Sequence, residues 1–570
     1  MDLRFLITLS ILGTIVSTTE CLRKEQEWRR DKICGPTSPH LRGNPLLVET
    51  QSGKIQGVQS VSRGGKEFIK FLGIPFAQPP VGKLRFESPK PFGKWDGVLN
   101  ATEYRRPCAY FDFFNKMQNG VEDCLYLNVL TPLNRSDDQL LPVLVYIHGL
   151  SFFFAGSLVY EGDYKMDHKI VIVTMDYRLG PLGFLNTNDG LIRGNMGLKD
   201  QNLALHWVQK NIRQFGGDPD LVTLSGTSVG AISVNHHLFS PRSKGLFSKA
   251  IMMSGSNLTP NGIMRSPKQT ADNFIAKVNC TVGSRKDEVA CLNNLNTSQI
   301  LNGYRDMIWL SEGGWLSRDG GYLGVGGCLG KVVVWGAWLS EGAWLSAGGG
   351  YLGVGGYLGH PIRPLAPFVL LFSATNEIIQ DDDTFIAEDP LETLKSGNFS
   401  KVPVIVGFAE FEMESLTAIY SGIPSESIQA SDNFSFWAPE KLCFERNYKI
   451  SEEIKQFYYH GDTTDITTGE KARQTSNLFS DRMFVSGVYK FAKLYSAHAP
   501  VFLYYHAWNH EPELRFANIF SGSHKNWTGN SNGEDSLLLF VRGDIKLDKG
   551  SRIFNLSEDL AELWTQFCNE

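Results

Sequence analysis

The chain has 570 residues and a formal net charge of −5, from 55 Lys and Arg against 60 Asp and Glu. These charges are spread without long blocks of one sign, which argues against nucleic acid or an anionic membrane surface as a partner. The length exceeds that of a typical domain, but domains with large insertions reach it. We therefore expect one large domain.

The opening residues predict a secretory signal peptide. Arg4 precedes an apolar run from Phe5 to Val16, and the small polar residues Ser17-Thr18-Thr19 follow. The run is too short to anchor a protein in a bilayer, and no later stretch offers about 20 uninterrupted apolar residues. We expect residues 1–19 to be the signal and the mature chain to be a soluble, extracellular protein without a membrane anchor.

Sequons and cysteines fit an oxidising, secretory environment. Candidate glycosylation sites of the type Asn-x-Ser/Thr occur at Asn100, Asn134, Asn257, Asn279, Asn296, Asn398, Asn433, Asn526 and Asn555. Cysteine spacing favours disulfides over the alternative of buried free thiols, although spacing does not fix the pairing. The candidate pairs are Cys108 with Cys124, Cys280 with Cys291, and Cys443 with Cys568.

Short β-branched runs alternate with helix-period segments, which predicts a sheet with helices on both faces. Residues 141–147 and 169–174 are expected to be buried central strands. Apolar positions between Asp200 and Phe215 follow one face of a helix, which Gly216-Gly217 ends. Residues 221–225 form the next predicted strand, which runs directly into Gly226-Thr-Ser-Val-Gly230. We therefore predict an α/β fold with a central, mostly parallel sheet.

The strand, tight turn and helix around Ser228 match the context of a nucleophile elbow. A serine on so sharp a turn needs small neighbours, which Gly226 and Gly230 supply. Ser228 is then exposed above the sheet, and the amide of Val229 at the start of the helix can help to hold a developing oxyanion. The alternative is an ordinary glycine-rich turn, since the bare motif also arises by chance.

Further motifs occur in a fixed order along most of the chain. They are Phe71-Leu-Gly-Ile-Pro-Phe-Ala-Gln-Pro-Pro80, Leu84-Arg-Phe86, Glu122-Asp-Cys-Leu-Tyr-Leu-Asn128, Asn195-Met-Gly-Leu-Lys-Asp-Gln201, Phe215-Gly-Gly-Asp-Pro219 and Val402-Pro-Val-Ile-Val-Gly407. With the elbow, they resemble the type-B carboxylesterases, the family of the cholinesterases and insect juvenile-hormone esterases. The resemblance implies an α/β-hydrolase fold over residues 38–570, a small-molecule ester substrate, and the disulfides Cys108–Cys124 and Cys280–Cys291.

The resemblance also implies acyl transfer, in which a serine attacks an ester, a histidine carries its proton and an acid orients the histidine. Ser228 takes the place of the nucleophile. The acid falls at Glu412, five residues beyond Gly407, with Glu410 and Glu414 as nearby alternatives.

The family's histidine position is taken by Asn532. An amide side chain cannot act as a general base near neutral pH, so Ser228 loses its activator. His524, eight residues upstream, is a candidate stand-in, although an unrelated loop histidine is the simpler interpretation.

The oxyanion loop departs from the family pattern as well, since it reads His148-Gly-Leu-Ser-Phe152. Leu150 and Ser151 replace two glycines, and their amides, with that of Val229, are the candidate oxyanion donors. Glycine permits backbone conformations and a close substrate approach that leucine resists. We expect no cofactor and no metal.

Residues 309–359 contain a repeat rich in Gly and Trp. The segment 309–317 recurs at 338–346, and the segment 321–327 recurs at 350–356. So few copies cannot build a stable solenoid, and this much glycine opposes a packed core, so we expect a disordered or loosely folded insertion. Residues 563–567 resemble the family's near-terminal helix, which suggests a shortened C-terminus.

Three interpretations follow. The first is a secreted carboxylic-ester hydrolase with a serine nucleophile, impaired by Asn532, and the preserved elbow and Glu412 favour it. The second is a catalytically inactive, cholinesterase-like binding or adhesion protein, which the replacements at Leu150, Ser151 and Asn532 favour. The third is an incorrectly assembled gene product, which the repeat and the short C-terminus favour. The sequence predicts no oligomeric state and does not identify the ester.

Overall fold

The computed structural model describes residues 44–112, 117–134, 139–150, 152, 156–311, 345–347, 350–352, 372–413, 434–445, 447–463, 469–507, 531–540 and 547–570. The chain separates into two units, Met1–Pro45 and Leu46–Glu570, and the helices and strands below all belong to the second. The predicted signal peptide lies outside the described residues.

Nine strands form the central sheet in the order β16-β15-β12-β11-β9-β10-β8-β4-β3. From β16 to β10 neighbouring strands are parallel, whereas β8, β4 and β3 extend the sheet with antiparallel pairs. The strands are β3 (Val58–Val61), β4 (Glu67–Pro75), β8 (Tyr126–Pro132), β9 (Leu141–Ile147), β10 (Val171–Met175), β11 (Gly217–Thr227), β12 (Lys249–Met253), β15 (Val404–Ala409) and β16 (Val501–His506). The strands predicted at 141–147, 169–174 and 221–225 are thus β9, β10 and β11.

Smaller strands form separate sheets. They are β1 (Leu47–Glu49) with β2 (Lys54–Gln56) and β5 (Val98–Asn100), β6 (Tyr110–Asp112) with β7 (Met117–Asn119), and β13 (Leu345–Ala347) with β14 (Gly350–Leu352). The last pair belongs to the predicted insertion at 309–359, most of which lies outside the described residues.

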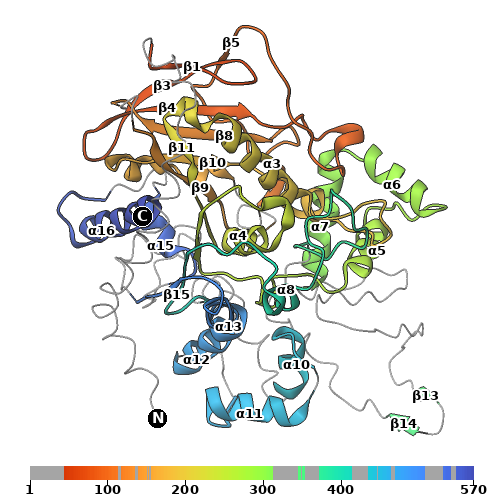
Figure 1. Ribbon diagram of the computed structural model, residues 1–570. Coiled ribbons are helices and arrows are strands. Elements are labelled where there is room, and N and C mark those ends of the chain that lie inside the picture. The colour runs from red at the N-terminus through yellow and green to blue at the C-terminus, as the bar shows by residue number, and fades with distance from the viewer. Residues whose placement is uncertain are drawn as a thin grey trace. The chain divides into compact units, whose positions relative to one another are not determined.

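The helices follow or connect the strands, and several of them pack against the central sheet (Figure 1). They are α2 (Gly180–Phe184), α3 (Met196–Asn211), α4 (Val229–Phe239), α5 (Pro267–Lys277), α6 (Arg285–Asn294), α7 (Thr297–Ser311), α8 (Pro390–Ser396), α10 (Phe434–Lys441), α11 (Tyr448–Tyr459), α12 (Gly469–Ser480), α13 (Ser486–Tyr495), α15 (Glu534–Leu539) and α16 (Arg552–Asn569). A 3₁₀ helix, Ile212–Phe215, continues α3, and Gly216 ends it with φ +82°, the left-handed conformation that glycine accepts most readily.

Both faces of the central sheet are buried, which explains why its central strands are apolar almost throughout. Successive side chains of β9 point to opposite faces. Val145 belongs to an apolar cluster with Leu205 of α3 and Ile232 of α4, whereas Tyr146 belongs to a second cluster with Trp564 of α16. The structure therefore confirms the predicted mostly parallel sheet with helices on both faces.

The structure contains the two disulfides expected from the sequence, Cys108–Cys124 and Cys280–Cys291. The third predicted pair is wrong. Cys568 is a buried free thiol on α16, whereas Cys443 is disulfide-bonded and its partner is therefore a different cysteine.

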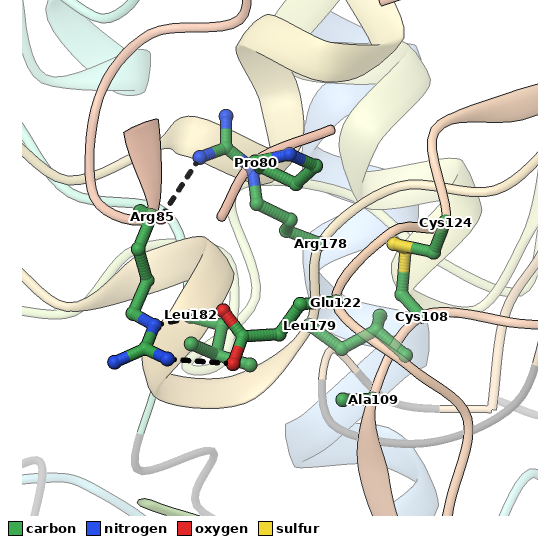
Figure 2. A pocket seen from close by; sticks show the side chains of 9 residues that line it. All are labelled: Pro80, Arg85, Cys108, Ala109, Glu122, Cys124, Arg178, Leu179 and Leu182. Carbon is green, nitrogen blue, oxygen red and sulfur yellow. Dashed lines mark hydrogen bonds and ion pairs between the residues drawn. A yellow bond between two sulfur atoms is a disulfide. The ribbon is translucent and has the colours of Figure 1, made fainter. Parts of the chain in front are cut away.

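The N-terminal motifs meet around the first disulfide (Figure 2). Arg85, from Leu84-Arg-Phe86, forms an ion pair with Glu122, from the Glu122–Asn128 motif, with Nε and Oε2 2.7 Å apart. Both side chains line a small pocket together with Cys108 and Cys124. The guanidinium of Arg178 donates to the backbone oxygen of Arg85 (3.0 Å), so these residues hold the N-terminal loops to the sheet rather than form a substrate site.

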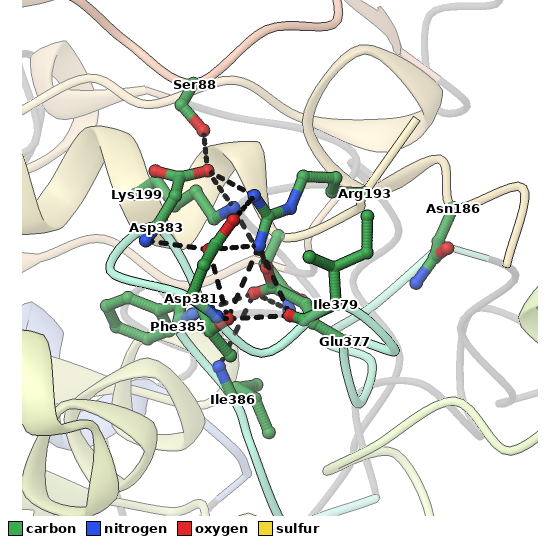
Figure 3. A network of polar contacts seen from close by, with 12 residues as sticks. Ser88, Asn186, Arg193, Lys199, Glu377, Ile379, Asp381, Asp383, Phe385 and Ile386 are labelled. Carbon is green, nitrogen blue, oxygen red and sulfur yellow. Dashed lines mark hydrogen bonds and ion pairs between the residues drawn. The ribbon is translucent and has the colours of Figure 1, made fainter. Parts of the chain in front are cut away.

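An ionic network, partly buried, ties the segment that contains residues 377–383 to α3 (Figure 3). Lys199 of α3 is 1% exposed, and its Nζ lies 3.0 Å from Glu377 Oε2 and 2.8 Å from Asp383 Oδ2. Arg193 pairs with Asp381 at 2.7 Å, and this hydrogen bond is the main reason that the pKa of Asp381 falls to about 2. Because loss of one partner in a buried pair leaves an uncompensated charge, the network fixes the segment firmly against α3.

Candidate active site

Ser228 lies between β11 and α4 in a strained backbone conformation, with φ 56° and ψ −120°. Few residues other than glycine adopt a positive φ, and such strain concentrates at functional sites. Its backbone N–H donates to the carbonyl oxygen of Met253 on β12 (2.8 Å), which holds the turn against the neighbouring strand. The side chain is neither fully buried nor fully exposed, so it is accessible at the end of the sheet.

The two glycines of the elbow are required by close packing. A Cβ on Gly226 would lie 2.5 Å from the carbonyl group of Gly230, and a Cβ on Gly230 would lie 2.2 Å from the carbonyl oxygen of Ile147. Neither residue therefore has room for a side chain. Val229, the first residue of α4, places its amide at the helix N-terminus, where backbone N–H groups have no partner within the helix.

The loop that follows β9 lies against the elbow. A Cβ on Gly149 would meet the Thr227 carbonyl oxygen at 2.4 Å and the Ser228 Cβ at 3.4 Å. Leu150 follows with φ 65°, a left-handed conformation that costs a leucine roughly 1–2 kcal/mol. The chain thus retains the backbone shape that glycine would favour here, even though the residue is leucine. Ser151 lies outside the described residues.

The histidines on α4 and on the loop after β9 are buried and do not titrate near neutral pH. The ring of His148 stacks on Tyr177 at 4.3 Å between centroids, and burial lowers the pKa of His148 to about 4. His236 and His237 on α4 are also buried, which lowers their pKa values to about 4 and about 3. All three are therefore neutral near pH 7. His524, the candidate stand-in, lies outside the described residues.

Glu412 is fully buried just beyond β15. The backbone N–H of Ala409 donates to its Oε1 at 2.7 Å, which orients the carboxyl group. Burial raises the pKa of Glu412 to about 7, although hydrogen bonds from Ala409 and Asn532 favour the ionised form. Of the two alternatives, Glu410 donates its backbone N–H to the His506 oxygen (2.9 Å), and Glu414 lies outside the described residues.

Asn532 contacts the Glu412 carboxyl group directly. Its Nδ2 donates to Oε2 of Glu412 at 2.8 Å and to the backbone oxygen of Ser254 at 3.2 Å. Its backbone N–H also donates to the backbone oxygen of Glu412 (3.1 Å). An amide nitrogen has two hydrogens, so both are used, and Oδ1 remains as an acceptor only.

Ser254, which no sequence motif marks, connects Asn532 to the elbow. It follows β12 with φ 57°, directly after Met253, whose oxygen binds the Ser228 amide. A Cβ on the next residue, Gly255, would lie 2.3 Å from the Ser228 backbone oxygen. Gly226-x-Ser-x-Gly has a recognisable spacing, whereas a serine that contributes its backbone oxygen leaves no signal in a single sequence.

A hydrogen-bonded pair that no sequence motif marks supports α15, the helix after Asn532. Asp535 on α15 is buried, and its Oδ2 accepts a hydrogen bond from the hydroxyl of Tyr504 on β16 at 2.6 Å. Burial and the nearby Asp535 raise the pKa of Tyr504 well above its ordinary value, so the phenol stays protonated and donates. The pair therefore anchors the start of α15 to the sheet.

A sequence model described as "Carboxylesterase family" matches residues 44–319 and 372–570. The chain belongs to the carboxylesterase family. Among its carboxylesterase relatives, juvenile hormone esterase of Tribolium castaneum is 32% identical over 95% of this chain and 85% of its own length. A carboxylic ester hydrolase of Bombus ignitus is 30% identical over 92% of this chain and 85% of its own length.

The carboxylesterase fold is also evident by comparison with a solved structure. The crystal structure of juvenile hormone esterase from Manduca sexta, with OTFP covalently attached, superposes with a TM-score of 0.73. It covers 92% of this chain and 90% of its own chain at 22% identity, so the likeness concerns the fold. Within the described residues of this carboxylesterase, no helix is both long and apolar enough to cross a membrane.

Proposed function

We propose that the chain is a secreted carboxylic-ester hydrolase with Ser228 as its nucleophile and with turnover limited by Asn532. The backbone of Ser228 carries this proposal. Its positive φ at the junction of β11 and α4 is strained, and strain of this kind persists where the surrounding structure enforces it for a function. Family membership supports ester hydrolysis as the reaction class.

The proposed reaction is acyl transfer in two steps. The Ser228 Oγ attacks the ester carbonyl carbon, the alcohol leaves with a proton, and the acyl group stays on the serine until water releases it as a carboxylic acid. The amides of Leu150, Ser151 and Val229 are the proposed donors to the oxyanion. Glu412 is the proposed orienting acid, and it holds Asn532 where the family holds histidine.

The amide at position 532 limits both steps. Its Nδ2 takes the place of a histidine N–H toward Glu412, but its Oδ1 is too weak a base to remove the serine proton. Loss of the histidine in a serine hydrolase costs roughly a millionfold in turnover and leaves roughly a thousandfold over water. We therefore propose slow hydrolysis, sustained by substrate binding and by the oxyanion stabilisation that remains.

A second candidate function is non-catalytic ester binding, as in the inactive cholinesterase-like binding proteins. One observation favours it. Both hydrogens of the Asn532 amide are used by Glu412 and Ser254, so the group is held firmly as a structural link and has no proton to transfer. In this case the site recognises an ester without cleaving it.

Hydrolysis of a short-chain p-nitrophenyl ester separates the two functions. The parent chain and Ser228→Ala are purified from the culture medium of secreting cells and compared at high enzyme concentration. If the chain is a hydrolase, the parent should release p-nitrophenol slowly, and Ser228→Ala should not release it. Equal release by both proteins would reject Ser228 catalysis and favour the binding function.

A further inference from the structure

We propose that six exposed asparagines, Asn100, Asn134, Asn279, Asn296, Asn398 and Asn555, carry N-linked oligosaccharides, and that the sequon at Asn257 stays unmodified. The proposal rests on entry of the chain into the secretory pathway, which is part of the proposed function. It goes beyond that function because it assigns modification sites, and the structure separates sequons that look equivalent in the sequence.

The chemistry requires an accessible carboxamide nitrogen. An oligosaccharyltransferase joins Nδ2 of the asparagine to C1 of the first sugar of a lipid-pyrophosphate-linked oligosaccharide. The N–C bond forms, the C–O bond to the pyrophosphate breaks, the lipid pyrophosphate leaves with the electron pair, and Nδ2 loses one proton. Because the product is bulky and hydrophilic, Nδ2 must face solvent in the folded protein.

The six asparagines satisfy this requirement. All are exposed, and in the described structure no hydrogen bond uses the side-chain nitrogen of any of them. At Asn296 the side-chain oxygen accepts from the Gln299 amide (2.9 Å), an N-cap contact at the start of α7. Attachment through Nδ2 leaves that oxygen in place, so the cap and the glycan are compatible.

Their backbone positions also favour access. Asn100 ends the edge strand β5, and Asn134 follows the end of β8. Asn279 follows α5 with φ 58°, and Asn398 directly follows the left-handed Gly397 that ends α8. Asn555 lies in the first turns of α16 on its exposed side. The ends of strands and helices lie at the protein surface, where an added sugar displaces only water.

Asn257 is the internal contrast. It is 2% exposed. The Asn257 backbone N–H donates to Asn235 Oδ1 at 3.0 Å, and a Cβ on Gly262 would lie 2.2 Å from the Asn257 backbone oxygen. A glycan there has no space in the folded chain, so molecules modified at Asn257 would not reach the native state.

The test reads every site directly. The full chain is expressed in mammalian cells, and protein from both the medium and the cell lysate is treated with peptide-N-glycosidase F in ¹⁸O-water. Each formerly glycosylated asparagine then becomes ¹⁸O-labelled aspartate, which peptide mass spectrometry locates. In protein from the medium, we expect the label at the six positions in most molecules and unlabelled asparagine at Asn257.

An unlabelled residue at any of the six in most molecules overturns the assignment of that site, and label at Asn257 in native protein overturns the argument from burial. As a second readout, Asn398→Gln should remove one glycan, whereas the exposed non-sequon control Asn294→Gln should remove none. Ester turnover should not change in either variant. Glycosylation and the proposed activity can therefore fail independently.

Discussion

The ionisation of Glu412 should make the stability of this protein depend on pH in a defined direction. Burial raises the pKa of Glu412 from an ordinary value of 4.5 to about 7, so the folded chain binds this proton more tightly than the unfolded chain. The stabilisation is fully present below pH 4.5 and is lost as the pH rises through about 7. Glu412→Gln keeps a neutral group at every pH and removes this dependence.

The magnitude follows from the two pKa values. Their difference corresponds to about 3 kcal/mol of free energy of unfolding, and the carboxyl group is fully buried, so solvent does not screen the effect. Relative to Glu412→Gln, the parent chain should therefore lose about 3 kcal/mol between about pH 4.5 and about pH 8.

Urea unfolding of the parent, Glu412→Gln and Ser228→Ala across this pH range measures the effect. Ser228→Ala is the control because it removes no group that titrates in this range, so its difference from the parent should not vary with pH. A constant difference between Glu412→Gln and the parent, or one that changes in the opposite direction, would refute the reasoning about the buried carboxyl group.

Three further predictions concern residues around the site. Leu150→Gly should raise ester turnover, and unchanged turnover would contradict this. The free energy of unfolding should change by less than about 1 kcal/mol, because relief of the left-handed strain offsets the lost packing. Gly230→Ala should destabilise the fold by about 3 kcal/mol in urea unfolding, since its Cβ meets the Ile147 oxygen, and an unchanged midpoint would show that the elbow can relax. Burial raises the pKa of the Cys568 thiol to about 11, so iodoacetamide should label its peptide only after denaturation, as mass spectrometry would show.

Local patterns predicted the part of the fold that carries the elbow. The apolar run at 141–147 gave the bounds of β9 directly, because a strand buried on both faces leaves a continuous apolar signal. Gly216 ended its helix as expected. The geometry around Gly226 and Gly230 also followed from sequence, since only a residue without a side chain fits so close to another backbone.

Contacts between distant segments were less predictable. Cys568 is a candidate partner of Cys443 in the sequence, but α16 buries it against the sheet as a free thiol, and spacing carries no information about which cysteines meet. Ser254 binds Asn532 through its backbone oxygen, and Tyr504 binds Asp535 through its hydroxyl group; neither contact has a sequence motif. The contact between Glu412 and Asn532 depended on family resemblance, because the two residues lie far apart in the chain.

The central claim is that Ser228, Glu412 and position 532 form a hydrolase site whose main defect is the missing base. The most direct test is p-nitrophenyl ester hydrolysis by Asn532→His, with Asn532→Gln as a control that restores no base. The imidazole N–H should replace Nδ2 as the donor to Glu412 Oε2, and turnover should rise by a factor on the order of 1,000 to a million. That gain should vanish in Ser228→Ala/Asn532→His. A folded Asn532→His protein no faster than the parent or than Asn532→Gln would contradict the account.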